Sequence, residues 1–312
     1  MKRKKNLIVF RIIFNQTIGS GHLYHATALF EEIDLKKFDV VFLLNSYDES
    51  IKSKINSQIQ ILIENNLEED LLKLNTAKYQ SLYFVNDTLD TTVKEVDTIK
   101  KFNFKTICIE DRGEGANNAD LVINALYSKC TLNPNEVNGP KYNLFRNEFY
   151  SEDNHLDQNE SFDKILISFG GTDPEMLTEK TIEYLIDLKI DNFCVLNPPH
   201  RTIINPKYQK WIIKGQVNVA KEIKNSKFVI SSGGRTVYEA NFLKKCSLVI
   251  CQNNRELTHS CLELDSVHSL GIFRDLDINK FSDGINTIEN KNINNFYNKW
   301  LSRGSLLNLI LK

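Results

Sequence analysis

The stretch Ser231-Ser-Gly-Gly-Arg-Thr-Val-Tyr-Glu-Ala240 decides the fold. The apolar run Lys227-Phe-Val-Ile230 precedes it, and a helix-like run follows it to about Lys245. A strand, a turn of small residues and a helix start in this order are typical of an α/β domain. The same order suits a diphosphate, because bare backbone N–H groups and the positive helix end converge on one point. An ordinary tight strand–helix connection has the same composition, so the motif alone leaves both interpretations open.

Length and charge indicate a soluble, two-domain chain. The 312 residues exceed the usual size of one hydrophobic core. Thirty-nine basic and 40 acidic residues give a formal net charge of −1, which argues against nucleic acid or an anionic membrane as partner. The apolar run 7–14 is broken by Arg11 and is too short for a membrane span or signal peptide. We therefore expect a cytoplasmic protein without stable membrane insertion.

Cysteine and acidic spacing predict neither disulfides nor a metal site. The six cysteines show no CxxC pairing, and several lie in apolar runs, which favours buried reduced thiols. The only Asp-x-Asp is Asp275-Leu-Asp277 in a late polar stretch. We expect no metal and no cofactor.

Alternating apolar runs and helical patterns predict parallel strands with crossover helices. Strands are expected at 7–14, 38–44, 81–85, 105–109, 120–124, 164–169, 193–196, 211–214, 228–231 and 247–251. Helix is expected within 49–75, from Asp173-Pro174 onward, at 219–224, and once or twice within 292–312.

A polar stretch at mid-chain divides these elements into two similar halves. We expect Rossmann-like domains at 1–150 and 163–312, a linker at 151–162, and a last helix that packs back on the N-terminal domain. Ligands of such sheets bind outside the carboxyl ends of the strands, which predicts a ligand cleft between the two halves.

Gly19-Ser-Gly-His22-Leu-Tyr-His25 begins as a dinucleotide fingerprint does, but His25 stands at the third glycine position. The second strand also ends without an acidic residue for a ribose, which argues against NAD or FAD. His22 would lie at a helix N-terminus, whose positive end disfavours a protonated imidazole. A neutral imidazole there suits a general base; a histidine that bonds its own backbone is the alternative. His25 could orient His22, bind an anion or cover the cleft wall.

Several segments, in one order, resemble the UDP-sugar hydrolase family of the pseudaminic acid pathway. These enzymes release UDP from UDP-2,4-diacetamido-2,4,6-trideoxy-β-L-altropyranose. The matching segments are residues 19–25, 109–112, 119–124, 139–149, 165–174 and 231–240, and the resemblance runs from about 7 to 265. It implies a GT-B fold, two Rossmann-like domains with parallel sheets facing a cleft.

The resemblance also implies roles for individual residues. His22 matches the histidine that activates water. The turns Gly170-Gly171-Thr172 and Ser232-Gly233-Gly234-Arg235-Thr236 match the diphosphate site, and Glu239 matches the ribose ligand. The remaining candidate substrate contacts are Gly19, Ser20, Gly21 and His25 in the first turn, Tyr142 and Arg146 near the sugar, Val217 near the uracil, and Asn254, Arg255, Glu256 and His259. For Arg255, Glu256 and His259, an exposed helix terminus with an ion pair is the alternative.

Three departures from the family pattern lie on the sugar side. His25 replaces an arginine, Gln252–His259 replaces an Asn-Gln pair, and Glu110-Asp111-Arg112 replaces a pair of acidic residues. The predicted function is metal-independent hydrolysis of a UDP-activated diacetamido-trideoxy sugar by a monomer or weak homodimer. A GT-B glycosyltransferase and a non-catalytic nucleotide-sugar-binding module remain alternatives. The lack of an apolar loop for a lipid-linked acceptor favours the hydrolase.

Overall fold

The computed structural model describes residues 4–13, 21–46, 55–153, 162–171, 173–197, 205–215, 217–291 and 296–312. The chain forms two compact units. The first comprises Met1–Leu144 and Leu301–Lys312, and the second comprises Phe145–Trp300. The change of unit therefore falls at Leu144, ahead of residue 150, and the start of the predicted linker at 151–162 is the end of helix α5 (Asn147–Asp153).

The first unit contains a seven-stranded parallel sheet in the order β3-β2-β1-β4-β5-β6-β7. Its strands are β1 (Asn6–Ile12), β2 (Phe38–Leu44), β3 (Gln60–Ile63), β4 (Leu82–Asp87), β5 (Lys105–Ile109), β6 (Leu121–Asn124) and β7 (Glu136–Asn138). The strand order reverses between β1 and β4, which pair with Ile12 opposite Asp87. This pair of strand ends is the topological switch point, where ligands of such sheets bind.

Helices cover both faces of this sheet, as the continuous apolar strands require. They are α1 (Gly21–Phe30), α3 (Leu67–Leu72), α4 (Val93–Lys101) and α10 (Ser305–Leu311). Side chains alternate along β1. Ile8, Phe10 and Ile12 join the core cluster with α1 and α10, whereas Leu7 and Val9 pack with Leu71 of α3 and Ile99 of α4.

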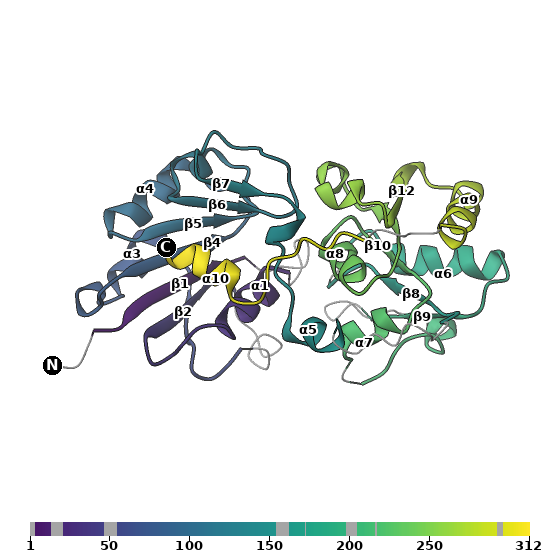
Figure 1. Ribbon diagram of the computed structural model, residues 1–312, viewed down its shortest axis with the longest axis horizontal. Helices are drawn as coiled ribbons and strands as arrows, with labels where there is room; N and C mark the ends of the chain where they lie inside the picture. The colour runs from purple at the N-terminus through teal and green to yellow at the C-terminus, as the bar shows by residue number, and fades with distance from the viewer. Residues whose placement is uncertain are drawn as a thin grey trace. The chain divides into compact units, whose positions relative to one another are not determined.

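Helix α10 follows the second unit along the chain but belongs to the first unit (Figure 1, yellow). Its Leu306, Leu307 and Ile310 are buried in the core cluster that contains α1. The Tyr83 hydroxyl and the Lys105 ammonium donate to its last carbonyls, each at 3.2 Å. Side chains from three parts of the unit therefore fix α10 in place.

The second unit contains a five-stranded parallel sheet in the order β12-β11-β10-β8-β9. Its strands are β8 (Ile165–Ser168), β9 (Phe193–Val195), β10 (Val229–Ser231), β11 (Ser247–Cys251) and β12 (Val267–Ile272). Besides α5, its helices are α6 (Leu177–Asp187), α7 (Val219–Lys224), α8 (Arg235–Phe242) and α9 (Ile278–Glu289). The strand order reverses between β8 and β10. Two parallel sheets with crossover helices confirm the predicted α/β class.

Several predicted elements were wrong in detail. Within 49–75, the described residues form β3 and the short α3 rather than one helix, and residues 47–54 lie outside the described chain. β3 is a partly exposed edge strand. Its mixture of polar and apolar residues therefore resembles the sequence pattern of an amphipathic helix. The predicted strand at 211–214 is an isolated bridge between Ile212 and Val195. Of the predicted helices within 292–312, the described residues contain α10 alone.

Helix α6 starts later than predicted. It begins at Leu177, because the buried Asp173 carboxylate accepts from the N–H groups of Leu177 and Thr178 at 2.8 and 2.9 Å. Asp173 thus satisfies the first turn from outside the helix. Across the described residues, no helix has the length and apolar character that a membrane crossing needs.

Candidate functional site

One carboxylate binds two histidines at the switch point of the first sheet. Nδ1 of His22 lies 2.5 Å from Oδ1 of Asp87, and Nδ1 of His25 lies 3.1 Å from Oδ2. All three side chains are buried. An ionised carboxylate only accepts hydrogen bonds, so both imidazoles donate from Nδ1. In neutral His22 this leaves Nε2 as the basic nitrogen.

The local fold explains this convergence. His22 is the second residue of α1, and His25 lies three residues on, so both point to one side of the helix. Asp87 is the last residue of β4 and shares its face with Val85, which packs in the α1 core cluster. Asn86 faces the opposite side of the sheet. The switch point therefore presents a carboxylate to the first turn of α1.

The two histidines favour the ionised form of the Asp87 carboxylate. Burial by itself would raise the pKa of Asp87. The charge and hydrogen bond of His22, joined by those of His25, outweigh this and hold the pKa of Asp87 below its ordinary range. A buried anion beside Nδ1 orients the ring and stabilises the imidazolium that forms when Nε2 takes a proton. This arrangement has the chemistry that a general base with an orienting carboxylate requires.

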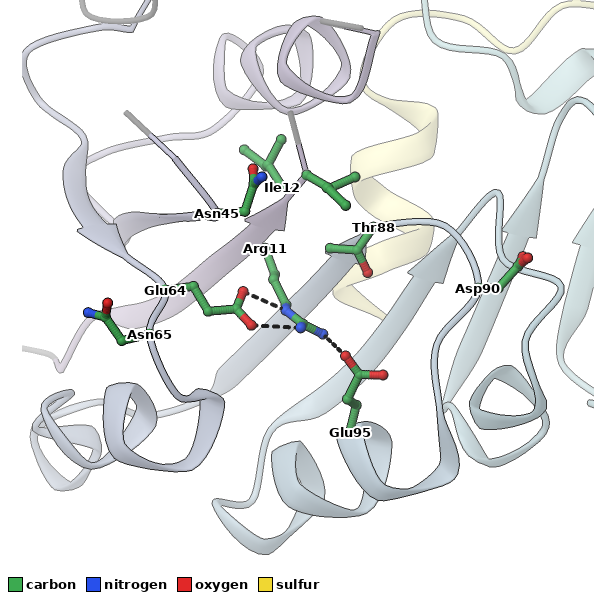
Figure 2. Close-up of a pocket in the computed structure, with 9 residues that line it drawn as sticks. Arg11, Ile12, Asn45, Glu64, Asn65, Thr88, Asp90 and Glu95 are labelled. Atoms are coloured by element: carbon green, nitrogen blue, oxygen red, sulfur yellow. Dashed lines mark hydrogen bonds and ion pairs between the residues drawn. The ribbon is translucent and has the colours of Figure 1, made fainter. Parts of the chain in front are cut away.

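The opposite face of the same strand ends carries an ion-paired pocket (Figure 2). Arg11 of β1 forms two hydrogen bonds to Glu64, at 2.8 and 2.7 Å, and an ion pair with Glu95 at 2.7 Å. Burial would lower the pKa of Arg11, but Glu64 and then Glu95 raise it overall. Glu95 also accepts from Thr92 in the capping box of α4. These polar groups satisfy one another, so we interpret the triad as structural.

Glu110 and Asp111, the acidic residues predicted to lie near the sugar, bind loop residues of the first unit. The Glu110 carboxylate accepts from the N–H groups of Ala125 and Leu126, at 3.2 and 3.1 Å. The Asp111 carboxylate accepts from the backbone N–H and the hydroxyl of Thr91, at 3.0 and 2.6 Å. Both acidic side chains are buried. They join the loops that follow β4, β5 and β6.

In the second unit, the two predicted glycine turns follow adjacent strands at the switch point. Ser168 of β8 pairs with Ser231 of β10; the first turn begins after Phe169, and the second begins directly after Ser231. Gly170 has a φ of 81°, a left-handed conformation that favours glycine. The Gln252 amide donates to the Phe169 carbonyl at 3.4 Å, which links the end of β11 to the first turn. The fold therefore brings the two turns to one edge of the sheet.

Both backbone polar groups of Gly233 bind side chains that follow β11. Its N–H donates to Oε2 of Glu256 at 3.2 Å, and its carbonyl accepts from Nδ1 of His259 at 2.5 Å. The N–H of Gly234 donates to the Ser232 carbonyl at 2.8 Å. The bare N–H groups expected at these two glycines are thus engaged within the protein. The first turn of α8, which starts at Arg235 and contains Thr236, is the remaining candidate for binding an anion at this edge of the sheet.

Glu239, the predicted ribose ligand, lies in the second turn of α8 and pairs with Arg146 at 3.2 Å. Arg146 also pairs with Glu148 at 2.8 Å. Sequence reasoning placed Arg146 in the N-terminal domain near the sugar, but it belongs to the second unit. The ion pair fixes the Glu239 carboxylate on the α8 surface.

The other predicted contacts are placed as follows. Gly21 opens α1, and Tyr142 ends a 3₁₀ turn of the first unit, Pro140–Tyr142. Val217 is half-buried beside the Asn218 cap of α7, and Arg255 caps the 3₁₀ turn Glu256–Thr258, with exposed Asn254 before it. Gly19, Ser20 and Thr172 lie outside the described residues.

Sequence reasoning missed Asp87, because a polar residue at a strand end is common. The described residues contain no group of three or more His, Cys, Asp or Glu side chains that could hold a metal ion.

Comparisons with known proteins show the fold. No family model matches the chain. An uncharacterized protein of Methanocaldococcus jannaschii is 30% identical over 272 residues, 79% of this chain and 55% of that protein, so the chain spans about half of that relative's length. The Methanocaldococcus jannaschii UDP-GlcNAc 2-epimerase in complex with UDP-GlcNAc and UDP matches with a TM-score of 0.57 at 11% identity, over 98% of each chain.

A UDP-glucosyltransferase from Polygonum tinctorium matches with a TM-score of 0.62 at 10% identity, over 100% of this chain and 93% of that chain. With the two parallel sheets, these likenesses show that the chain has the GT-B fold. The predicted fold class is confirmed.

Proposed function

We propose that the protein binds a UDP-sugar and catalyses attack at its anomeric carbon, with His22 as the general base. The observation that carries this proposal is the hydrogen bond from His22 Nδ1 to the buried Asp87 carboxylate at the switch point. A buried carboxylate that binds the Nδ1–H of a histidine leaves its Nε2 as the nitrogen that can accept a proton. The solved structures with this fold include an epimerase bound to UDP-GlcNAc and UDP, which supports the class of ligand.

In the proposed reaction, Nε2 of His22 takes a proton from water as the water oxygen bonds to the anomeric carbon. The bond between that carbon and the β-phosphate oxygen breaks, and UDP leaves with the electron pair. Asp87 stabilises the imidazolium that forms. A positioned base of this kind contributes about 10²–10⁴-fold to the rate.

The second unit would bind the leaving group. The N–H groups of the first turn of α8 and the guanidinium of Arg235 offer positive charge to the diphosphate. This charge lets the departure of UDP proceed without a metal ion. Glu239, held by Arg146, would accept from a ribose hydroxyl.

Water is the acceptor that we propose, and a diacetamido-trideoxy sugar is the product, because several sequence segments resemble those of the UDP-sugar hydrolases. Glycosyl transfer is the second candidate, favoured by the likeness to a UDP-glucosyltransferase. In a transferase the same histidine would deprotonate an acceptor hydroxyl.

The test is to incubate the protein with UDP-2,4-diacetamido-2,4,6-trideoxyhexoses and to follow UDP and free sugar. We expect both products in equal amounts without an added acceptor. UDP release that requires an acceptor glycan would replace the hydrolase by the transferase, and no release under either condition would refute both.

The variant His22→Ala should lose turnover and keep its affinity for UDP, measured by calorimetry. His268→Ala is the matched control, because His268 is half-buried in β12 of the second unit, outside the proposed site. Full activity of His22→Ala would refute the proposed base.

A further inference from the structure

The Glu256 side chain, which comes from the segment after β11, binds the backbone of the turn that follows β10. Its Oε2 accepts from the N–H of Gly233 at 3.2 Å and from the N–H of Gln252 at 2.7 Å. Gln252 directly follows β11, and Gly233 follows β10, so one carboxylate oxygen joins the ends of two neighbouring strands. Three residues after Glu256, His259 donates to the Gly233 carbonyl. The Gly233 residue is therefore held from both sides by one segment.

Close packing accompanies these bonds. A Cβ atom at Gly233 would lie 3.2 Å from Sγ of Cys251 and 3.3 Å from Cβ and the carbonyl oxygen of Glu256. The segment lies against the backbone itself, which leaves no room for a ligand group between Glu256 and Gly233. Glu256 therefore cannot contact a sugar through the oxygen that binds this turn.

The bound carboxylate brings negative charge to the place where an anion is proposed to bind. Burial raises the pKa of Glu256 overall, although the hydrogen bonds from the N–H groups of Gln252 and Gly233 act to lower it. Gly233 stands two residues before the start of α8, whose first turn is the proposed diphosphate donor. The negative charge of the Glu256 carboxylate would therefore repel a diphosphate bound at this turn.

We infer that Glu256 is a positioning residue for nucleotide binding with two opposed effects: its hydrogen bonds fix the turn, and its charge weakens the binding of the diphosphate. This inference rests on the proposed function. It assigns to Glu256 a structural contact with the protein turn in place of the sugar or phosphate contact expected from the sequence. The two effects are separable, because an amide keeps the acceptor oxygen and removes the charge.

The experiment measures the affinity of the full chain for UDP by calorimetry, with uridine as the probe without phosphate. Glu256→Gln keeps one acceptor oxygen, and Glu256→Ala removes it. We expect Glu256→Gln to bind UDP about 3- to 10-fold more tightly than the wild type, an effect that shrinks at high salt. Glu256→Ala should bind UDP about 10-fold more weakly than Glu256→Gln, because the turn loses its anchor.

A purely structural role for Glu256 would weaken UDP binding in both variants, so loss in both overturns the charge effect. Equal UDP affinity of all three proteins overturns the inference and leaves the proposed function intact. Absence of UDP binding by the wild type overturns both. If Glu256→Ala does not fold, the comparison of Glu256→Gln with the wild type, for UDP against uridine, still decides the charge effect.

Discussion

Nδ1 of His22 lies 2.5 Å from Oδ1 of Asp87, although 65 residues separate them along the chain. The first residue comes from the start of α1 and the second from the end of β4. The reversal of strand order between β1 and β4 brings these two ends together. The contact between the His22 imidazole and the Asp87 carboxylate is thus a product of topology.

Replacing Asp87 by Asn should reduce turnover by about 10²–10⁴-fold, because the amide neither stabilises the imidazolium nor fixes the Nδ1–H tautomer. Affinity for UDP should stay unchanged. The measurement is the steady-state rate of UDP release with a parallel UDP titration. Asp39→Asn, at a partly exposed ion pair with Lys5, is the control and should leave the rate unchanged. Wild-type turnover in Asp87→Asn would contradict the role of this carboxylate.

The Asp87 carboxylate should also make stability depend on pH. Its pKa in the folded protein lies below the ordinary value, because the two histidines outweigh the effect of burial. Its contribution is therefore complete above the unfolded-state pKa of about 3.9 and is lost as the pH falls toward the folded-state pKa. Urea unfolding below about pH 5 should show a steeper fall in the free energy of unfolding for the wild type than for Asp87→Asn. Equal slopes would contradict this assignment.

Gly233→Ala should lower the free energy of unfolding by about 1–3 kcal/mol, because the added methyl group meets Cys251 and Glu256 at close range. It should also weaken UDP binding. Gly234→Ala adds the same methyl group where the nearest neighbouring atom is Oγ of Ser232 at 3.9 Å, and should cost less. Chemical denaturation and calorimetry of both variants check the contrast. The reverse order of the two losses would argue against the packed turn.

Arg11→Leu should lower the free energy of unfolding by about 3 kcal/mol, since it leaves Glu64 and Glu95 facing each other without a cation. Lys5→Gln breaks a partly exposed ion pair with Asp39 and should lower the free energy of unfolding by less than about 1 kcal/mol. Denaturant titration of the two variants measures the difference. Equal small losses would show that solvent screens the triad.

Much of the fold could be predicted from the sequence, because the central strands are continuous apolar runs. The segments 38–44, 105–109 and 247–251 match β2, β5 and β11 residue for residue. Edge strands could not be predicted in this way. β7 spans only Glu136–Asn138, and half-buried polar residues at an edge have no strand-like apolar signal.

The parts of the candidate site that could be predicted are those whose sequence pattern lies within one continuous segment. The turn after β10 and the histidine at the start of α1 each stand beside a strong apolar strand. Pairings between distant segments were not predictable: Asp87 with His22, Arg146 with Glu239, and Glu256 with Gly233 each depend on strand order or side-chain packing. For Glu256, the same chemistry that suits a ligand contact satisfies the protein backbone.

Ile310→Ala in α10 should lower the free energy of unfolding by about 2–5 kcal/mol, because its side chain is fully buried in the core of the first unit. Asn308→Ala lies on the exposed side of the same helix and should change stability by less than about 0.5 kcal/mol. Urea unfolding, followed by a signal from the first unit, measures the free energy of unfolding of both variants. A negligible effect of Ile310→Ala would show that the unit is stable without α10.

The position of α10 also orders the events of protein synthesis. Domains generally fold as the chain emerges, with the N-terminal part first. Here residues 145–300 separate the seven-stranded sheet from the helix that covers part of its face. On the ribosome, the second unit can therefore finish folding while the first still exposes the apolar surface that Leu306, Leu307 and Ile310 later cover. Of the two units, the one whose sheet is synthesised first is completed only after the other has been synthesised.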